Sequence, residues 1–283
     1  MAEDEKFAVK EFTASDGYLH KYRRFDPTDH AKAEIVYLHG IQSHAGWYDH
    51  SSQRLADAGF AVSFFDRRGS GQNQESRGDA PGFRRLIDDV AEFIKSMEAK
   101  PIYVLALSWG GKVAVALDRR HPGLVSGLVL MCPGFFAQVR PPLGQRLAIL
   151  WSRLVNPTRK FPIPLSEPEL FTENPRWLEF LRKDPLALHQ ATARLLVESV
   201  RLDTYLRFSA KCVKLPVLLL LAGKDRIIRN DCTRRYVESF GSSDKTILEY
   251  PDSHHTLEFE AEPDPIIDDV IGWLNDHLPG THS

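Results

Sequence analysis

One segment indicates the architecture of the whole chain: Ile102-Tyr103-Val104-Leu105-Ala106-Leu107-Ser108-Trp109-Gly110-Gly111. Six apolar residues lead into a serine, and two glycines follow closely, which predicts a buried strand, a tight turn and a helix. In this arrangement the turn forces Ser108 into a strained backbone conformation and points its hydroxyl out of the sheet. Neighbouring backbone approaches closely two positions before and after such a serine, and Ala106 and Gly110 are small enough to allow it. Ser108 is therefore the candidate nucleophile.

Short apolar runs alternate with helical patterns on both sides of this segment. The apolar runs cover residues 35–38, 60–65, 125–131, 217–222 and 247–250. The helical patterns cover residues 47–58, 82–97, 113–119 and 266–278. A hairpin is expected at the start of the chain, from residues 7–13 and 19–25. Continuous apolar runs are typical of strands with both faces covered, so we predict an α/β fold whose mostly parallel central β-sheet is flanked by helices.

The stretch from residue 134 to residue 210 interrupts this alternation. It is rich in proline and carries short helical patterns over residues 145–155 and 186–206. We predict that residues 134–210 form a helical cap insertion without a core of its own. The predicted core then consists of residues 1–133 and 211–283.

A serine hydroxyl needs a neighbouring base, and the base needs a carboxylate that orients it. In a strand-turn-helix site of this kind the chain order is serine, acid, histidine. Asp225 follows the apolar run 217–222 and is the candidate acid, while Asp231 fits better as the N-cap of the next helix. The candidate base lies in the loop after residues 247–250, where His254 and His255 are adjacent and compete for the role.

Acyl transfer also needs backbone N–H groups that stabilise a tetrahedral oxyanion. We expect one from Trp109, directly after the nucleophile, and one from Ile41, in the loop after the apolar run 35–38. Gly40 is expected to permit the turn that aims the Ile41 N–H group. His39 is expected to organise this loop by hydrogen bonding and not to carry a proton in the reaction.

Taken together, these residues resemble the monoacylglycerol lipase and lysophospholipase branch of the α/β-hydrolases, over nearly the whole chain. Two positions depart from the usual pattern of that branch, since Ala106 and Ser70 replace a glycine and a histidine. The spacings from Ser108 to Asp225 and from Asp225 to His255, 117 and 30 residues, also resemble it. The motifs that carry the resemblance are Leu38-His39-Gly40, Phe65-Asp66-Arg67-Arg68-Gly69-Ser70-Gly71, Ser108-Trp109-Gly110-Gly111, Lys183-Asp184-Pro185-Leu186, Gly223-Lys224-Asp225 and His255-Thr256-Leu257.

The resemblance implies an α/β-hydrolase fold with a helical cap over the site. It favours His255 over His254 as the base, because Thr256, Leu257 and acidic residues follow His255 as they do in relatives. It also implies a serine carboxylester hydrolase that cleaves monoacylglycerol or lysophospholipid-like lipids through an acyl-enzyme on Ser108. Apolar residues of the cap are expected to make transient contact with lipid surfaces.

Composition excludes several other classes of function. The 36 Lys+Arg and 38 Asp+Glu residues leave a formal net charge of -2, which gives no reason to expect a nucleic acid partner. The start Met1-Ala2-Glu3-Asp4-Glu5-Lys6 is acidic and lacks the apolar stretch of a secretory signal. Three scattered cysteines suit a reducing compartment, so a cytoplasmic protein is expected, with no metal and no organic cofactor.

Other activities use the same three side chains. An acyltransferase, a thioesterase or an aminopeptidase remains open, because fold and triad do not separate these reactions. An aminopeptidase needs acidic groups for the free amine of its substrate, and Glu167, Glu169 and Glu173 in the predicted cap are the candidates. A ligand-binding hydrolase homologue without catalysis is a further alternative. The sequence leaves the oligomeric state open.

Overall fold

The computed structural model describes residues 7–98 and 101–280 of the chain. The acidic start, Met1 to Lys6, on which the expectation about a secretory signal rests, lies outside these ranges. Within them, no helix combines the length and the apolar character that crossing a bilayer requires.

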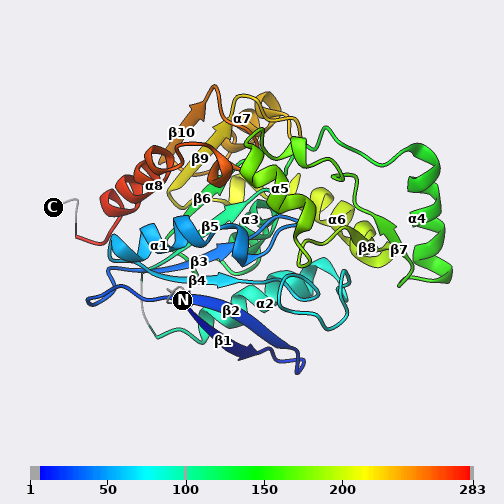
Figure 1. The fold of residues 1–283 in the computed structure, drawn as a ribbon. Helices are drawn as coiled ribbons and strands as arrows, with labels where there is room; N and C mark the ends of the chain where they lie inside the picture. Colours follow the sequence, from blue (N-terminus) through cyan, green and yellow to red (C-terminus); the bar gives the residue numbers. More distant parts are fainter. Residues whose placement is uncertain (1–6, 99–100, 281–283) are drawn as a thin grey trace, which may run out of the picture.

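A single eight-stranded sheet forms the centre of the molecule (Figure 1). Six neighbouring strands of this sheet pair in parallel, and a hairpin from the start of the chain joins one edge of them in antiparallel orientation. This confirms the predicted mostly parallel sheet. In spatial order the strands are β1 (Ala8–Thr13), β2 (Leu19–Phe25), β4 (Ala61–Phe65), β3 (Glu34–Leu38), β5 (Ile102–Leu107), β6 (Gly127–Met131), β9 (Val217–Ala222) and β10 (Lys245–Tyr250).

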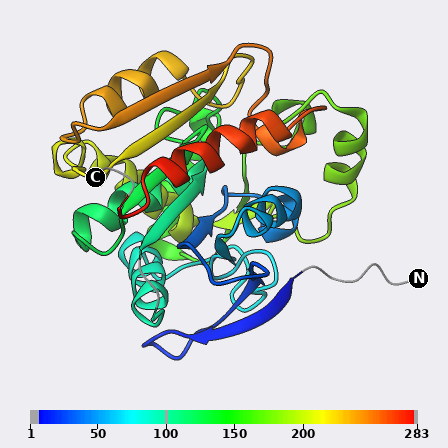
Figure 2. The same ribbon diagram turned by 90° about the vertical axis from the view of Figure 1, so that its left-hand side faces the viewer.

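Helices cover both faces of the sheet (Figure 2). On one face α1 (Asp49–Asp57) packs beside α8 (Asp264–Asp276), and on the other α2 (Phe83–Lys95) packs beside α3 (Trp109–Arg120). This double cover explains why every residue of β3, β4, β5, β6 and β9 is buried. The short 3-10 helices are η1 (Ala45–Trp47), η3 (Ala210–Cys212) and η4 (Leu257–Phe259).

Two helix starts differ from the sequence prediction. α3 begins at Trp109 and not at residue 113, because Gly110 packs closely against Leu38 and His39, and Gly111 against Pro133, which keeps both glycines helical despite their low helix propensity. α7 (Asn230–Glu238) has Arg229 as its N-cap, so the prediction that Asp231 caps this helix is wrong. Asp231 instead lies in the first turn and pairs with Arg235 one turn later.

Residues 134–210 fold beside one end of the sheet (Figure 1). The predicted helix over 186–206 begins only at residue 193, because residues 190–192 pair with 160–162. Most buried apolar side chains of residues 134–210 belong to the same hydrophobic cluster as those of the sheet. The division of the chain into a core and an inserted cap stays a prediction. Its elements are α4 (Leu143–Val155), β7 (Lys160–Pro162), η2 (Pro168–Leu170), α5 (Pro175–Lys183), β8 (Gln190–Thr192) and α6 (Ala193–Leu206).

Candidate active site

Ser108 lies in the turn between β5 and α3 in a strained conformation. Its φ and ψ angles are 47° and -118°, a region that residues with a side chain rarely adopt. A Cβ atom at Gly110 would lie 2.6 Å from the carbonyl oxygen of Leu38, so glycine is required two residues after the serine. The serine N–H group donates to Met131 O at 3.0 Å, which fastens the turn to β6. The turn therefore has the strain and the close approach expected of a nucleophile site.

The structure brings Ser108, His255 and Asp225 into one hydrogen-bonded chain. His255 Nε2 lies 2.9 Å from Ser108 Oγ, and His255 Nδ1 lies 2.7 Å from Asp225 Oδ2. The other carboxylate oxygen of Asp225 accepts from the N–H groups of Ile227 and Ile228, at 2.7 and 3.0 Å. The carboxylate is thereby fixed toward the imidazole, and the imidazole toward the hydroxyl.

The adjacent His254 has different partners. Glu260 accepts a hydrogen bond from the His254 N–H group at 2.6 Å and lies 3.1 Å from its Nδ1 atom. The Nε2 atom of His254 lies 3.3 Å from a carboxylate oxygen of Glu173, in residues 134–210. His254 thus joins two loops, while His255 is the histidine in contact with Ser108.

The loop after β3 lies against the serine. A Cβ atom at Gly40 would meet Ser43 Oγ at 3.1 Å and Ser108 Cβ at 3.4 Å. Gly40 has no left-handed φ, so the expectation that it permits a turn is wrong: a side chain there would crowd Ser43 Oγ and fill the space beside Ser108. Ile41 and Ser108 line the same pocket, as a donor to an oxyanion on Ser108 requires.

His39 organises this loop, as the sequence predicts. Its Nε2 atom accepts from the Arg67 N–H group at 2.9 Å, so Nδ1 carries the hydrogen and donates to Gly40 O at 2.7 Å. Burial, together with the charge of Arg67, holds the pKa of His39 well below its usual value. The ring is therefore neutral and acts as a fixed hydrogen-bonding bridge.

The pocket above Ser108 is mostly apolar. Two of its walls come from residues 134–210, through Leu165 and Phe171. Phe171 O accepts from the Thr256 N–H group at 3.0 Å, and the Phe171 ring meets the His255 ring edge to face. Sequence reasoning missed Phe171, because no motif marks it within the proline-rich stretch. The described lining residues are Gly40, Ile41, Gln42, Ser43, Trp47, Tyr48, Leu107, Ser108, Leu165, Phe171, His255 and Thr256.

One group of potential metal ligands coincides with this site. Among the described residues, ligand atoms of Cys132, Asp225 and His255 lie within 4.8 Å of one another. Burial raises the pKa of the Cys132 thiol well above its usual value, so the thiolate that binds metals is disfavoured. Asp225 and His255 already use the atoms in question in their mutual hydrogen bond. The arrangement therefore suits proton transfer better than metal binding.

Comparisons with known proteins agree with this geometry. The monoacylglycerol lipase of Mycolicibacterium smegmatis is 26% identical over 274 residues, which cover 94% of this chain and 96% of the relative. The monoglyceride lipase of Homo sapiens is 26% identical over 273 residues, with 92% and 88% covered. A solved structure of a soluble variant of monoglyceride lipase from Saccharomyces cerevisiae, in complex with a substrate analog, has a TM-score of 0.84 at 16% identity and covers 98% of both chains.

The structural likeness confirms the predicted α/β-hydrolase fold. The model of one family, Hydrolase_4, described as serine aminopeptidase, S33, matches residues 29–262. This match spans most of the chain, so the protein belongs to the Hydrolase_4 family, serine aminopeptidase S33.

Proposed function

We propose that this protein is a serine carboxylester hydrolase that cleaves monoacylglycerol or lysophospholipid-like lipids. The observation that carries the proposal is the hydrogen-bonded chain from Ser108 through His255 to Asp225 at the floor of a mostly apolar pocket. Full-length similarity to monoacylglycerol lipases supports the same substrate class. An acyl chain is the part of such a substrate that suits apolar pocket walls.

The reaction follows from the positions of these atoms. His255 Nε2 accepts the proton of Ser108 Oγ while that oxygen bonds to the ester carbonyl carbon. The N–H groups of Ile41 and Trp109 are proposed to bind the oxyanion that forms. His255 then gives its proton to the leaving alcohol as the ester bond breaks, and Asp225 stabilises the imidazolium throughout. A water molecule then bonds to the acyl carbon while His255 takes its proton, and the proton passes to Ser108 Oγ as its bond to the acyl group breaks and the acid leaves.

An aminopeptidase is the weaker reading, although the family bears that description. None of the described residues that line the pocket carries a carboxylate for a substrate amine. Glu169 pairs with Arg182, and Glu173 faces His254. Two of the three acidic residues considered for this role are therefore engaged elsewhere, and the third, Glu167, is not among the described residues that line the pocket. Thioester hydrolysis and acyl transfer use the same three side chains. Relative rates on esters, thioesters and aminoacyl amides distinguish these activities from ester hydrolysis.

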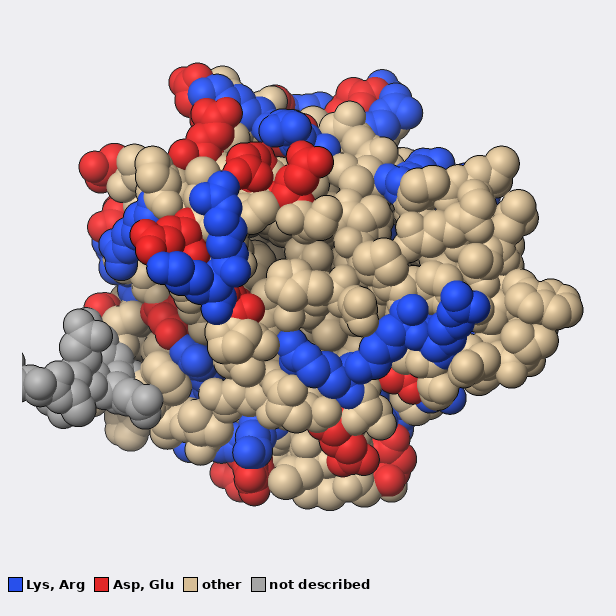
Figure 3. Space-filling model, turned by 45° about the vertical axis from the view of Figure 1, so that its right-hand side comes forward, with Lys and Arg blue, Asp and Glu red and all other residues tan. Residues whose placement is uncertain are grey.

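We also propose that α4 contacts lipid surfaces. Its solvent-facing side carries Leu143, Leu147, Leu150, Trp151 and Leu154, all of them exposed. Soluble proteins seldom leave so many large apolar side chains together in water without a binding partner. Figure 3 shows a wide area without charge on the right-hand side of the molecule, bordered by Lys and Arg side chains. A cationic border suits the anionic headgroups of a membrane.

A reducing compartment such as the cytoplasm is proposed as the place of action. The three cysteines Cys132, Cys212 and Cys232 are all free, and Cys212 is exposed. An exposed free thiol is compatible with a reducing environment and is a liability in an oxidising one.

The test is hydrolysis of p-nitrophenyl esters from acetyl to palmitoyl, of a monoacylglycerol and of matching thioesters and aminoacyl amides. We expect turnover of medium or long acyl esters, reduced about 10⁴-fold or more in Ser108→Ala. Asp225→Asn should reduce kcat by about 10⁴-fold, because the histidine loses its correct tautomer. The matched control, Asp231→Asn on the surface of α7, should keep wild-type rates. Ester turnover that survives in Ser108→Ala would refute the proposal.

A further inference from the structure

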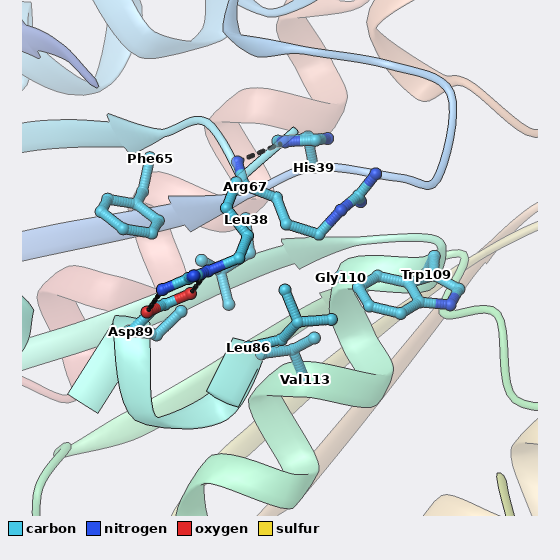
Figure 4. Close-up of a pocket in the computed structure, with 11 residues that line it drawn as sticks. Leu38, His39, Phe65, Arg67, Leu86, Asp89, Trp109, Gly110 and Val113 are labelled. Atoms are coloured by element: carbon cyan, nitrogen blue, oxygen red, sulfur yellow. Dashed lines mark hydrogen bonds and ion pairs between the residues drawn. The ribbon is translucent and has the colours of Figure 1, made fainter. Parts of the chain in front are cut away.

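A buried guanidinium contacts both residues of the proposed oxyanion site. Arg67 follows β4, and its side chain reaches between the loop after β3 and the ring of Trp109 (Figure 4). Its Nη1 and Nη2 atoms donate to Gly40 O at 3.3 Å and to Ile41 O at 3.0 Å. Its carbon Cζ lies 4.9 Å from the centre of the Trp109 ring. One side chain thus contacts both residues whose N–H groups are proposed to bind the oxyanion.

The contact with Gly40 O has a direct electrostatic consequence. Gly40 C=O and Ile41 N–H belong to the same peptide unit, so donors to the carbonyl oxygen polarise the N–H group at its other end. Two donors converge on that oxygen, His39 Nδ1 at 2.7 Å and Arg67 Nη1 at 3.3 Å. The Ile41 N–H group is therefore a stronger donor than an isolated peptide.

The second peptide of the site is built in the same way. The Trp109 N–H group shares its peptide unit with Ser108 O. That oxygen accepts from Gly111 N at 3.0 Å and from Gly134 N at 2.7 Å. Each of the two oxyanion peptides thus has two hydrogen-bond donors on its carbonyl oxygen. Of these four donors only Arg67 carries a full positive charge.

The charge of Arg67 is not cancelled by its own contacts. Besides the two carbonyl oxygens its partner is the hydroxyl of Ser70, at 3.3 Å, and none of the three is a carboxylate. Burial lowers the pKa of Arg67 to about 10, which leaves the guanidinium charged at neutral pH. The next residue, Arg68, is equally buried but holds Asp89 at 2.6 Å and Asp16 at 3.0 Å. Arg68 therefore forms structural ion pairs, whereas the hydrogen-bond partners of Arg67 are all neutral oxygens.

We propose that Arg67 is a positioning residue of the oxyanion site, which orients and polarises the Gly40–Ile41 peptide so that Ile41 N–H binds the developing negative charge. This inference rests on the proposed ester hydrolysis at Ser108. The neighbouring carboxylate of Asp66 favours the charged guanidinium, but no ion pair joins Arg67 to a carboxylate among the described residues. A buried charge without an ion-pair partner costs folding stability, so its place beside this peptide indicates a role in the reaction.

The two neighbouring arginines allow a matched test, Arg67→Met against Arg68→Met. Arg67→Met should lower kcat for a soluble ester by about 10-fold to 100-fold with little change in KM, because the lost interaction acts in the transition state. Its melting temperature should fall less than that of Arg68→Met, which leaves the buried Asp89 short of a partner. Arg68→Met should keep the wild-type kcat. Titration with a fluorophosphonate counts the active sites in each preparation, so that each kcat is calculated per folded, competent enzyme.

A second readout separates polarisation from general damage. A trifluoromethyl ketone forms a tetrahedral oxyanion with Ser108, whereas the parent methyl ketone only occupies the pocket. Affinity for the trifluoromethyl ketone should fall in proportion to kcat in Arg67→Met, and affinity for the methyl ketone should not. Arg67→Lys keeps the charge without the planar fork and should give an intermediate kcat.

Other outcomes overturn the inference. Wild-type kcat in Arg67→Met, a change confined to KM, or parallel losses of kcat and melting temperature in both arginine variants would each do so. If the wild-type protein hydrolyses no ester and resists the fluorophosphonate, the proposed function fails first, and the two failures are thereby distinguished.

Discussion

Glu258 is a fully buried carboxyl group three residues after His255. Its Oε1 atom accepts from the Ser51 N–H group, in the first turn of α1, at 2.9 Å. This contact fastens the loop of His255 to a helix on the core. Burial raises the pKa of Glu258 to about 7, and its hydrogen bonds with Ser51 only partly oppose the shift.

The raised pKa predicts a pH-dependent stability. Since the folded pKa exceeds the unfolded one, the protonated carboxyl stabilises the fold fully below about pH 4.5, and this contribution is lost as the pH rises to about 7. The loss amounts to at most about 3 kcal/mol. Between pH 5 and pH 7 the free energy of unfolding of the wild type should therefore fall relative to Glu258→Gln, which still accepts from Ser51. Urea denaturation at a series of pH values measures this difference, and a constant difference would contradict the prediction.

At the scale of elements, α4 is a helix with its apolar side turned to solvent. Leu154 is 78% exposed and Trp151 is 65% exposed, while the buried Ile149 packs in a small cluster with Phe161 and Ala193. The helix therefore packs on the protein through one narrow side and presents its larger apolar side outward, where a lipid surface can cover it.

Replacement of Leu147 and Leu154 by serine should weaken binding to vesicles. Each side chain is exposed, so the fold loses little, whereas a membrane contact loses two apolar side chains, or roughly 2–4 kcal/mol of transfer free energy. Co-sedimentation with anionic phospholipid vesicles measures binding, and hydrolysis of a soluble short-chain ester checks that the site is intact. Phe208→Ser, at an exposed residue outside α4, is the control. Equal binding by all three proteins would remove α4 from the lipid contact.

The same elements show where sequence patterns succeed. The apolar runs 35–38 and 217–222 became β3 and β9, because burial of both sheet faces leaves a continuous pattern. The three-residue strands β7 and β8 were missed, since so short a pairing leaves no periodicity and depends on a partner about thirty residues away. The loop after β3 was located correctly, but the reason for Gly40 was not, because the atoms beside it, Ser43 Oγ and Ser108 Cβ, come together only in the folded loop.

At the scale of the whole molecule, chain order and the apolar runs that precede them identified Ser108 and Asp225, because parallel strands end at one edge of a sheet. The choice of His255 over its neighbour His254 came from the family resemblance. The residues that support them were not predictable in this way. Arg67 and Glu258 act through carbonyl oxygens or N–H groups of residues 26 and 207 positions away, and such partners leave no local pattern. The contacts between residues 134–210 and the rest of the protein also join residues far apart in the sequence, so they too leave no local pattern.

Asp184 makes the clearest contact between residues 134–210 and the rest of the protein. Its buried Oδ2 atom accepts from His44 Nε2 at 2.9 Å and from Trp47 Nε1 at 2.6 Å, so it ties residues 134–210 to the segment that follows the oxyanion loop. Burial opposes the charged form, yet the hydrogen bond from His44 keeps the pKa of Asp184 below its usual value. Asp184→Ala leaves both buried donors without this acceptor and should cost about 2–4 kcal/mol of unfolding free energy.

The same variant should loosen residues 134–210 before the sheet unfolds. Limited trypsin digestion followed by mass spectrometry should show faster cleavage within 134–210 than within the strands. Glu179→Ala, which removes only an exposed pair with Lys183, should digest like the wild type. Uniformly faster cleavage along the chain would instead mean that residues 134–210 and the sheet unfold as one unit, in which case the predicted division into core and cap has no thermodynamic meaning.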